Sequence, residues 1–103
     1  LLEHKDLRRD MLNTYLEAWN NYDFYLNKID NQIKIIDTLK LKLKGNEILY
    51  KAQKINITEL IESQKDLNDA QNILLDLNSL KKYYLIDILI FNGDLNTIIN
   101  GLG

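Results

Sequence analysis

The sequence has no proline and no cysteine, and it holds only four glycines in 103 residues. Because proline removes a backbone donor and clashes with the preceding helical turn, its absence over such a length favours long uninterrupted helices. Without cysteine there is no disulfide framework and no thiolate metal site. The formal net charge of −2 is too small to indicate a nucleic-acid partner or an acidic substrate. A chain of this length is one domain at most.

The chain also lacks an apolar run of about 18 residues, so we expect no transmembrane helix. No signal peptide is visible at its start, which is polar, helix-like and without an initiator methionine. We therefore interpret the chain as a segment of a longer protein that is soluble by itself.

Residues for catalysis or metal binding are scarce. His4 is the only histidine, and a metal site would need further histidine or cysteine ligands. Ser63 and Ser79 have no histidine that could act as an oriented base, and no glycine-rich phosphate loop occurs. We expect no enzymatic activity, no cofactor and no metal.

The first apolar pattern predicts a long helix over about residues 5–52. Its apolar residues alternate at spacings of three and four, which is typical of the a/d seam of a left-handed coiled coil: Leu12, Tyr15, Trp19, Tyr22, Leu26, Ile29, Ile33 and Ile36. A second apolar line runs beside it through Met11, Ala18, Tyr25, Ile35 and Leu39. Two lines on one helix predict neighbours on more than one side. The aromatic side chains could also form a stacking platform for a ligand, although packing is the more common role at helical spacing.

The second pattern predicts a helix over about residues 57–92, with Leu60, Leu67, Leu74 and Leu77 on one stripe. Its late part, residues 83–91, is apolar nearly all round, and such a helix must be buried on every face. We therefore expect this part to pack against other chains or against a missing part of the parent. Asn92 and Gly93 would form a C-cap pair, and residues 93–103 would form a short tail.

Residues 53–56 are the predicted turn between the two helices. Asn56 is a good N-cap because its side-chain oxygen can accept from a backbone N–H one turn on, and Glu59 can complete a capping box. Gly45-Asn46 is an alternative point of reversal, since Gly-Asn is a common turn pair. The expected fold is all-α: a long antiparallel helical hairpin (coiled coil) that completes a four-helix or larger bundle by self-association. The expected contact regions are residues 12–36 and 83–91, and the isolated chain would form an antiparallel dimer.

The turn and the helix after it resemble the outer-membrane efflux proteins of the TolC type. The family pattern is Tyr, two variable residues, Gly, then Thr or Ser, an aliphatic residue, an acid, Val or Leu, Leu and another acid. The matching stretch here is Tyr50-Lys-Ala-Gln53-Lys-Ile-Asn56-Ile-Thr-Glu59-Leu60-Ile61-Glu62, followed by Gln64, Leu67, Ala70 and Gln71. The end of the family's helix, near a Gly-x-Leu, corresponds here to Tyr83, Tyr84 and Gly93-Asp94-Leu95. Two departures limit what the resemblance implies: the family's turn glycine is Gln53 here, and the position that can carry a gating basic residue in the family is Ile55. Lys54 is an alternative candidate for the basic role.

The resemblance implies a hairpin of the periplasmic α-barrel of an export channel, in a multidrug efflux or type I secretion system. It implies a trimer in the full-length parent, which would be an outer-membrane protein with this segment in the periplasm. A periplasmic adaptor and an inner-membrane pump would be its partners. Tyr50, Glu59 and Glu62 would lie at the periplasmic entrance, where the tyrosine would help to hold the entrance shut.

A basic zone near the turn has two interpretations. It consists of Lys40, Lys42, Lys44, Lys51 and Lys54, and it is either a solvated helix face or a docking surface at the hairpin tip. For docking, the candidates are Lys51, Gln53, Lys54 and Asn56. The alternative to the export channel is a coiled-coil interaction module of an adaptor or scaffold protein.

Overall fold

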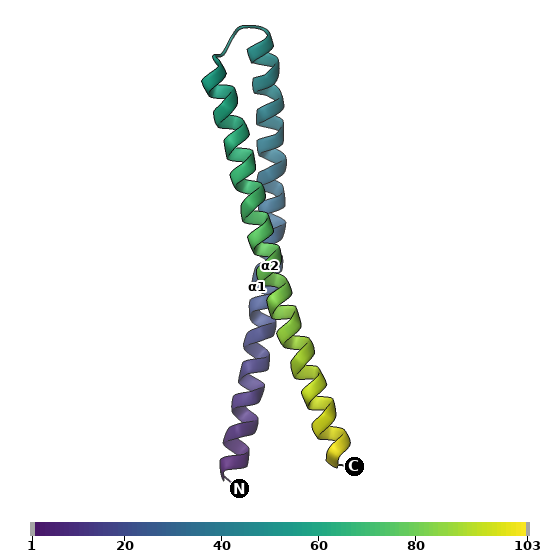
Figure 1. Ribbon diagram of the computed structural model, residues 1–103. Coiled ribbons are helices and arrows are strands. Elements are labelled where there is room, and N and C mark those ends of the chain that lie inside the picture. The colour runs from purple at the N-terminus through teal and green to yellow at the C-terminus, as the bar shows by residue number, and fades with distance from the viewer. Residues whose placement is uncertain (1, 103) are drawn as a thin grey trace. The chain divides into compact units, whose positions relative to one another are not determined.

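A computed structural model describes residues 2–102, without the side chains of residues 2–4, 95, 98, 99 and 102, so those of His4 and Leu95 lie outside the described residues. Two helices, α1 (Leu2–Lys51) and α2 (Ile57–Leu102), are joined by a short turn (Figure 1). The described residues contain no strand, and the expectation of an all-α helical hairpin is confirmed. The hairpin divides into two compact units. We call residues 27–78 the turn unit, and residues 2–26 with 79–102 the terminal unit.

The chain reverses at residues 52–56 and not at Gly45-Asn46, which lies inside α1. α1 ends in a Schellman motif, in which the backbone N–H of Gln53 donates to the carbonyl of Tyr50 at 2.9 Å. The N–H of Lys54 donates to the carbonyl of Leu49, also at 2.9 Å. Gln53 has a φ of 59°, in the left-handed region that glycine usually occupies.

α2 begins directly after the predicted N-cap. The backbone N–H of Glu59 donates to Oδ1 of Asn56 at 3.1 Å, so one of the orphan donors of the first turn is satisfied. Ile55 and Leu60 hold the two positions of a hydrophobic staple around this cap, and both are half-buried. Glu59 also places a carboxylate near the positive end of the helix dipole.

The seam of α1 differs in part from the predicted one. Apart from Asn21, its buried and half-buried residues follow an unbroken spacing of three and four: Met11, Tyr15, Ala18, Tyr22, Tyr25, Ile29, Gln32, Ile36, Leu39, Leu43 and Asn46. Every second predicted position was therefore right, but the other four are exposed: Leu12, Trp19, Leu26 and Ile33. Each of these four residues directly follows a seam residue. The predicted second line supplies most of the missing seam residues, since Met11, Ala18, Tyr25 and Leu39 are buried or half-buried and only its Ile35 is exposed. Gln32 belonged to neither predicted line, and it lies in the seam with a hydrogen bond to α2.

The predicted stripe of α2 is confirmed, because Leu67 is buried and Leu60, Leu74 and Leu77 are half-buried. The predicted end of the helix at residue 92 is wrong, since α2 continues to Leu102. The Asn92 side chain accepts a hydrogen bond from the hydroxyl of Tyr15 at 3.1 Å, and no glycine among the described residues has a positive φ. A glycine inside a helix costs about 1 kcal/mol, so Gly93 by itself need not end α2.

The turn unit has a small core that is partly polar. Its buried cluster and the leucines packed against it are Ile36, Leu67, Ala70, Leu39, Leu43 and Leu74. Nε2 of the buried Gln32 donates to the carbonyl of Ala70 at 2.9 Å. Nδ2 of Asn46 donates to Oγ of the buried Ser63, which in turn donates to the carbonyl of Glu59 at 2.9 Å. Hydrogen bonds therefore satisfy polar groups at two layers of this seam.

Candidate functional site

The two candidate entrance acids, Glu59 and Glu62, lie together on the first turns of α2. Both are exposed, and both line a groove of about 250 Å³ in the turn unit. The other lining residues are Lys42, Asn46, Ser63 and Asp66. Carboxylate oxygens are typical ligands of hard cations. Among the described residues, however, no group of three or more acidic, histidine or cysteine side chains has the arrangement of a metal site.

Tyr50, the third entrance candidate, does not belong to this groove. Its side chain is exposed near the end of α1, and its backbone carbonyl accepts the hydrogen bond from Gln53 that closes the helix. Glu59 and Glu62 therefore lie together on α2 and line the groove, and Tyr50 on α1 does not line it.

The docking candidates lie at the turn with exposed side chains: Lys51, Gln53, Lys54 and Asn56. Oδ1 of Asn56 accepts the N-cap hydrogen bond from the backbone N–H of Glu59. The two lysines flank the left-handed residue Gln53, so positive charge is presented on both sides of the turn.

Aromatic side chains of the terminal unit pack against one another. Tyr15 stacks on Phe91 with ring centroids 4.4 Å apart, and Tyr25 stacks on Tyr84 at 5.6 Å. Trp19 meets the ring of Tyr15 edge-on at 6.3 Å. Such geometries are the favoured ones for aromatic pairs. These ring contacts agree with the packing role, and the role of a stacking platform for a ligand stays a prediction.

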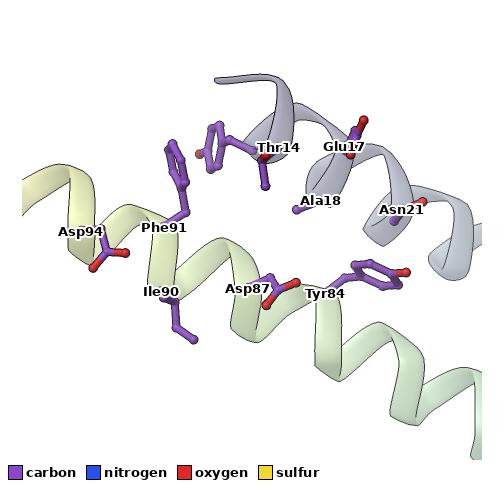
Figure 2. Close-up of a pocket in the computed structure, with 10 residues that line it drawn as sticks. Thr14, Glu17, Ala18, Asn21, Tyr84, Asp87, Ile90, Phe91 and Asp94 are labelled. Carbon is purple, nitrogen blue, oxygen red and sulfur yellow. The ribbon is translucent and has the colours of Figure 1, made fainter. Parts of the chain in front are cut away.

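A second groove, of about 300 Å³, lies between α1 and α2 in the terminal unit (Figure 2). Its lining residues are Thr14, Tyr15, Glu17, Ala18 and Asn21 from α1, and Tyr84, Asp87, Ile90, Phe91 and Asp94 from α2. Ala18 is the small seam residue between the two stacked aromatic layers, and its short side chain leaves space that a larger one would fill.

Glu17, Asp87 and Asp94 supply the carboxylates among the residues that line this groove, and no binding role was predicted for them from the sequence. A signal was present in the sequence, because residues 14–21 and 84–94 contain these three acids and no lysine, arginine or histidine. Recognising it requires the pairing of the two segments, which only the hairpin supplies.

None of the described helices is long and apolar enough to span a membrane. No protein-family model matches the chain, and comparisons with curated proteins and with solved structures found no similar protein. The comparisons give no support for the resemblance to TolC-type proteins, which stays a prediction from the residues around the turn and along α2.

Proposed function

We propose that this chain is a helical hairpin from the periplasmic α-barrel of a TolC-like outer-membrane export channel. The observation that carries the proposal is the backbone of Gln53, whose φ of 59° occurs at the motif position where the family has glycine. Because glycine adopts positive φ at little cost, a family with glycine there is expected to reverse its chain at that residue. The chain reverses at the same residue here. This agreement supports the alignment of residues 50–62 with the family's turn.

The accessible surface supports a place in a larger assembly. The chain exposes 8182 Å², about 2,000 Å² more than a compact monomer of 12.1 kDa would expose. A typical protein interface covers about 800 Å² of each partner, so the excess corresponds to contacts with more than one neighbour. In the terminal unit, Leu12 and Trp19 on α1 and Ile86 and Leu89 on α2 are exposed apolar side chains available for such contacts.

In the proposed channel, three protomers form the tunnel, and the turn faces a periplasmic adaptor and an inner-membrane pump. Glu59 and Glu62 would form rings of carboxylates near the entrance, and such rings favour cations. The protein would guide substrates without making or breaking a bond. Tyr50 would contribute hydrogen bonds that hold the entrance shut, and the lysines beside Gln53 would contact the partner proteins.

The location of the parent protein tests the proposal. Antibodies raised against the hairpin should detect the parent in the outer-membrane fraction of the cells that express it, and chemical cross-linking should give a complex of three copies. A parent found away from the outer membrane, or cross-linked only as a dimer, would contradict an export channel.

The two acids allow a functional test in the assembled channel. Replacing both, Glu59→Gln and Glu62→Gln, should lower the preference for cations and weaken block by multivalent cations in single-channel recordings. Asp76→Asn is the matched control, because it removes an exposed carboxylate of α2 away from the turn. If selectivity and block are the same in the double variant and in the control, the two glutamates have no role in conduction and only stabilise the N-terminus of α2.

A coiled-coil interaction module of an adaptor or scaffold is the second candidate. The unbroken heptad seams favour it, because such seams serve interaction modules of many kinds. The sequence that flanks this chain in its gene distinguishes the two candidates. A channel parent carries a secretory signal and amphipathic β-strands, whereas a scaffold needs neither.

The exposed apolar residues also give a prediction that both candidates share. The isolated chain should self-associate at micromolar concentrations through its exposed apolar residues, as an antiparallel dimer with four helices. Analytical ultracentrifugation measures this directly. A well-folded monomer at all micromolar concentrations would show that the exposed apolar area is tolerated without a partner.

A further inference from the structure

The groove of the terminal unit is lined by acidic side chains and by no basic side chain of the described residues. Among its lining residues are three carboxylates, those of Glu17, Asp87 and Asp94, and no basic side chain. In an antiparallel helix pair, residues that flank the seam can pair with charges on the other helix. Here the polar residues of α1 that line the groove near Ala18 are Thr14, Glu17 and Asn21, and none of them is basic. The groove is therefore complementary to a positively charged occupant.

The floor and the ends of the groove are apolar or aromatic. Ala18 lies on α1 across from Asp87 on α2 (Figure 2). The stacked rings of Tyr15 and Phe91 close one end, and the ring of Tyr84 lies at the other. Aromatic faces attract cations within about 6 Å of the ring centroid, and the attraction grows as water is displaced. A few polar groups on an apolar wall are typical of sites for small molecules.

We propose that this groove binds a small organic cation with an apolar body, such as an alkyl- or arylammonium ion. The ammonium group lies beside the carboxylate of Asp87, and the apolar body covers Ala18 between the rings of Tyr84 and Phe91. Asp94, two helical turns further along α2, supplies a second and more distant negative charge. A metal ion does not suit the groove as well, because it would leave the apolar wall uncovered. The proposal uses only residues of the terminal unit and is independent of the export-channel proposal.

Nuclear magnetic resonance of the full chain tests the proposal with benzyltrimethylammonium as the probe. Saturable amide shifts should cluster in residues 14–21 and 84–94. Tetramethylammonium supplies the charge without the aromatic body, and benzyl alcohol supplies the body without the charge. Both should bind more weakly than the probe, and added sodium chloride should weaken the binding of the probe by screening. Equal shifts with benzyl alcohol, or shifts spread over both units, would overturn the proposal.

Paired variants locate the charge. Changing Asp87→Asn together with Asp94→Asn should weaken binding of the probe by about fivefold, as expected for two partly exposed charge pairs. The matched control changes Asp69→Asn together with Asp76→Asn, two exposed acids of α2 in the turn unit, and should leave affinity unchanged. Equal losses in the two double variants would indicate a general effect of net charge and would contradict a specific groove.

A third variant removes the space without removing charge. Ala18→Leu places a larger apolar side chain on the groove floor and should abolish the saturable shifts. Circular dichroism checks that this variant remains helical. Because the asparagine variants do not alter the seam, they decide the question if Ala18→Leu disturbs the fold. Absence of saturable groove shifts in the unmodified chain overturns the proposal, including the case in which a second copy of the chain covers the groove.

Discussion

The turn unit and the terminal unit hold the same two helices together with different side chains. In the turn unit, buried aliphatic residues such as Ile36 and Leu67 alternate with hydrogen-bonded polar residues such as Gln32 and Ser63. In the terminal unit, Ile88 is the most deeply buried apolar residue in the described part of the chain, and stacked aromatic rings surround its layer. A buried polar group costs stability if it loses its partner, so polar layers tolerate few alternative registers.

The difference indicates two ways to specify a helix pair. The bond from Gln32 to the carbonyl of Ala70 fixes one layer of the turn unit at a defined register. Aromatic stacking tolerates more geometries, and the rings of the terminal unit leave a groove beside the small residue Ala18. We infer that hydrogen-bonded polar layers fix the register within the turn unit, whereas the aromatic packing of the terminal unit leaves a groove open at its surface.

The largest effect is expected from Ile88→Ala. Ile88 is 2 % exposed, so truncation should lower the free energy of unfolding by about 3 kcal/mol through lost burial and a cavity. Leu41→Ala is the matched control, because Leu41 is exposed, lies outside the expected contact regions, and its change should stay within about 0.5 kcal/mol. Urea denaturation at one fixed protein concentration measures both, since self-association would otherwise shift the result.

Amide hydrogen exchange on the Ile88→Ala variant then tests whether the two units are separate in energy. If they are, exchange should accelerate in the terminal unit and remain slow in the turn unit. Uniform acceleration over both units would show that they unfold together as one cooperative unit. The two units would then differ in the composition of their seams but not in stability.

A smaller effect is expected from Gln32→Ala in the turn unit. The change removes the hydrogen bond to Ala70 and part of a buried side chain, and should cost about 1–2 kcal/mol. Gln71→Ala is the control, because Gln71 is exposed on α2 and its loss should cost less than about 0.5 kcal/mol. Equal values for the two glutamines would mean that aliphatic contacts alone fix the register.

The sequence predicted the features that depend on local chemistry. The N-cap at Asn56 and the carboxylate of Glu59 lie three residues apart in the chain, so no knowledge of the partner helix was needed to find the start of α2. The choice between Gln32 and Ile33 for the seam was different. Gln32 lies in the seam because its side chain donates to the carbonyl of Ala70, which is distant in sequence. A prediction from apolarity alone placed Ile33 in the seam, and Ile33 is exposed.

Two further features were beyond the sequence pattern for the same reason. The continuation of α2 past Asn92 accompanies a hydrogen bond from the hydroxyl of Tyr15 on the other helix. The groove arises because Ala18 lies between aromatic layers contributed by both helices. Each feature combines residues that are far apart in the chain, and helical periodicity describes only one helix at a time.

The next effect concerns the point of reversal. Asn56→Ala should cost about 1 kcal/mol, because the N–H of Glu59 loses its capping partner. Gly45→Ala should instead raise the free energy of unfolding by up to about 1 kcal/mol, since Gly45 lies inside α1 and an added Cβ meets no atom within 4 Å. Urea denaturation of both variants is the measurement. A harmless Asn56→Ala with a damaging Gly45→Ala would place the turn at Gly45-Asn46.

The smallest effect, and the one that bears most directly on function, is expected from Gln53→Gly. A glutamine at a φ of 59° carries a steric cost that glycine avoids, but glycine also loses more chain entropy on folding. The two terms oppose each other, so we expect a net gain of only a few tenths of a kcal/mol. The control is Gln64→Gly, at an exposed position inside α2, where the same substitution should cost about 0.5–1 kcal/mol. Opposite signs for the two substitutions would support a turn that suits the family's glycine at residue 53. Equal losses would mean that Gln53 leaves the left-handed region in solution. The positive φ of Gln53 would then no longer support a TolC-like turn.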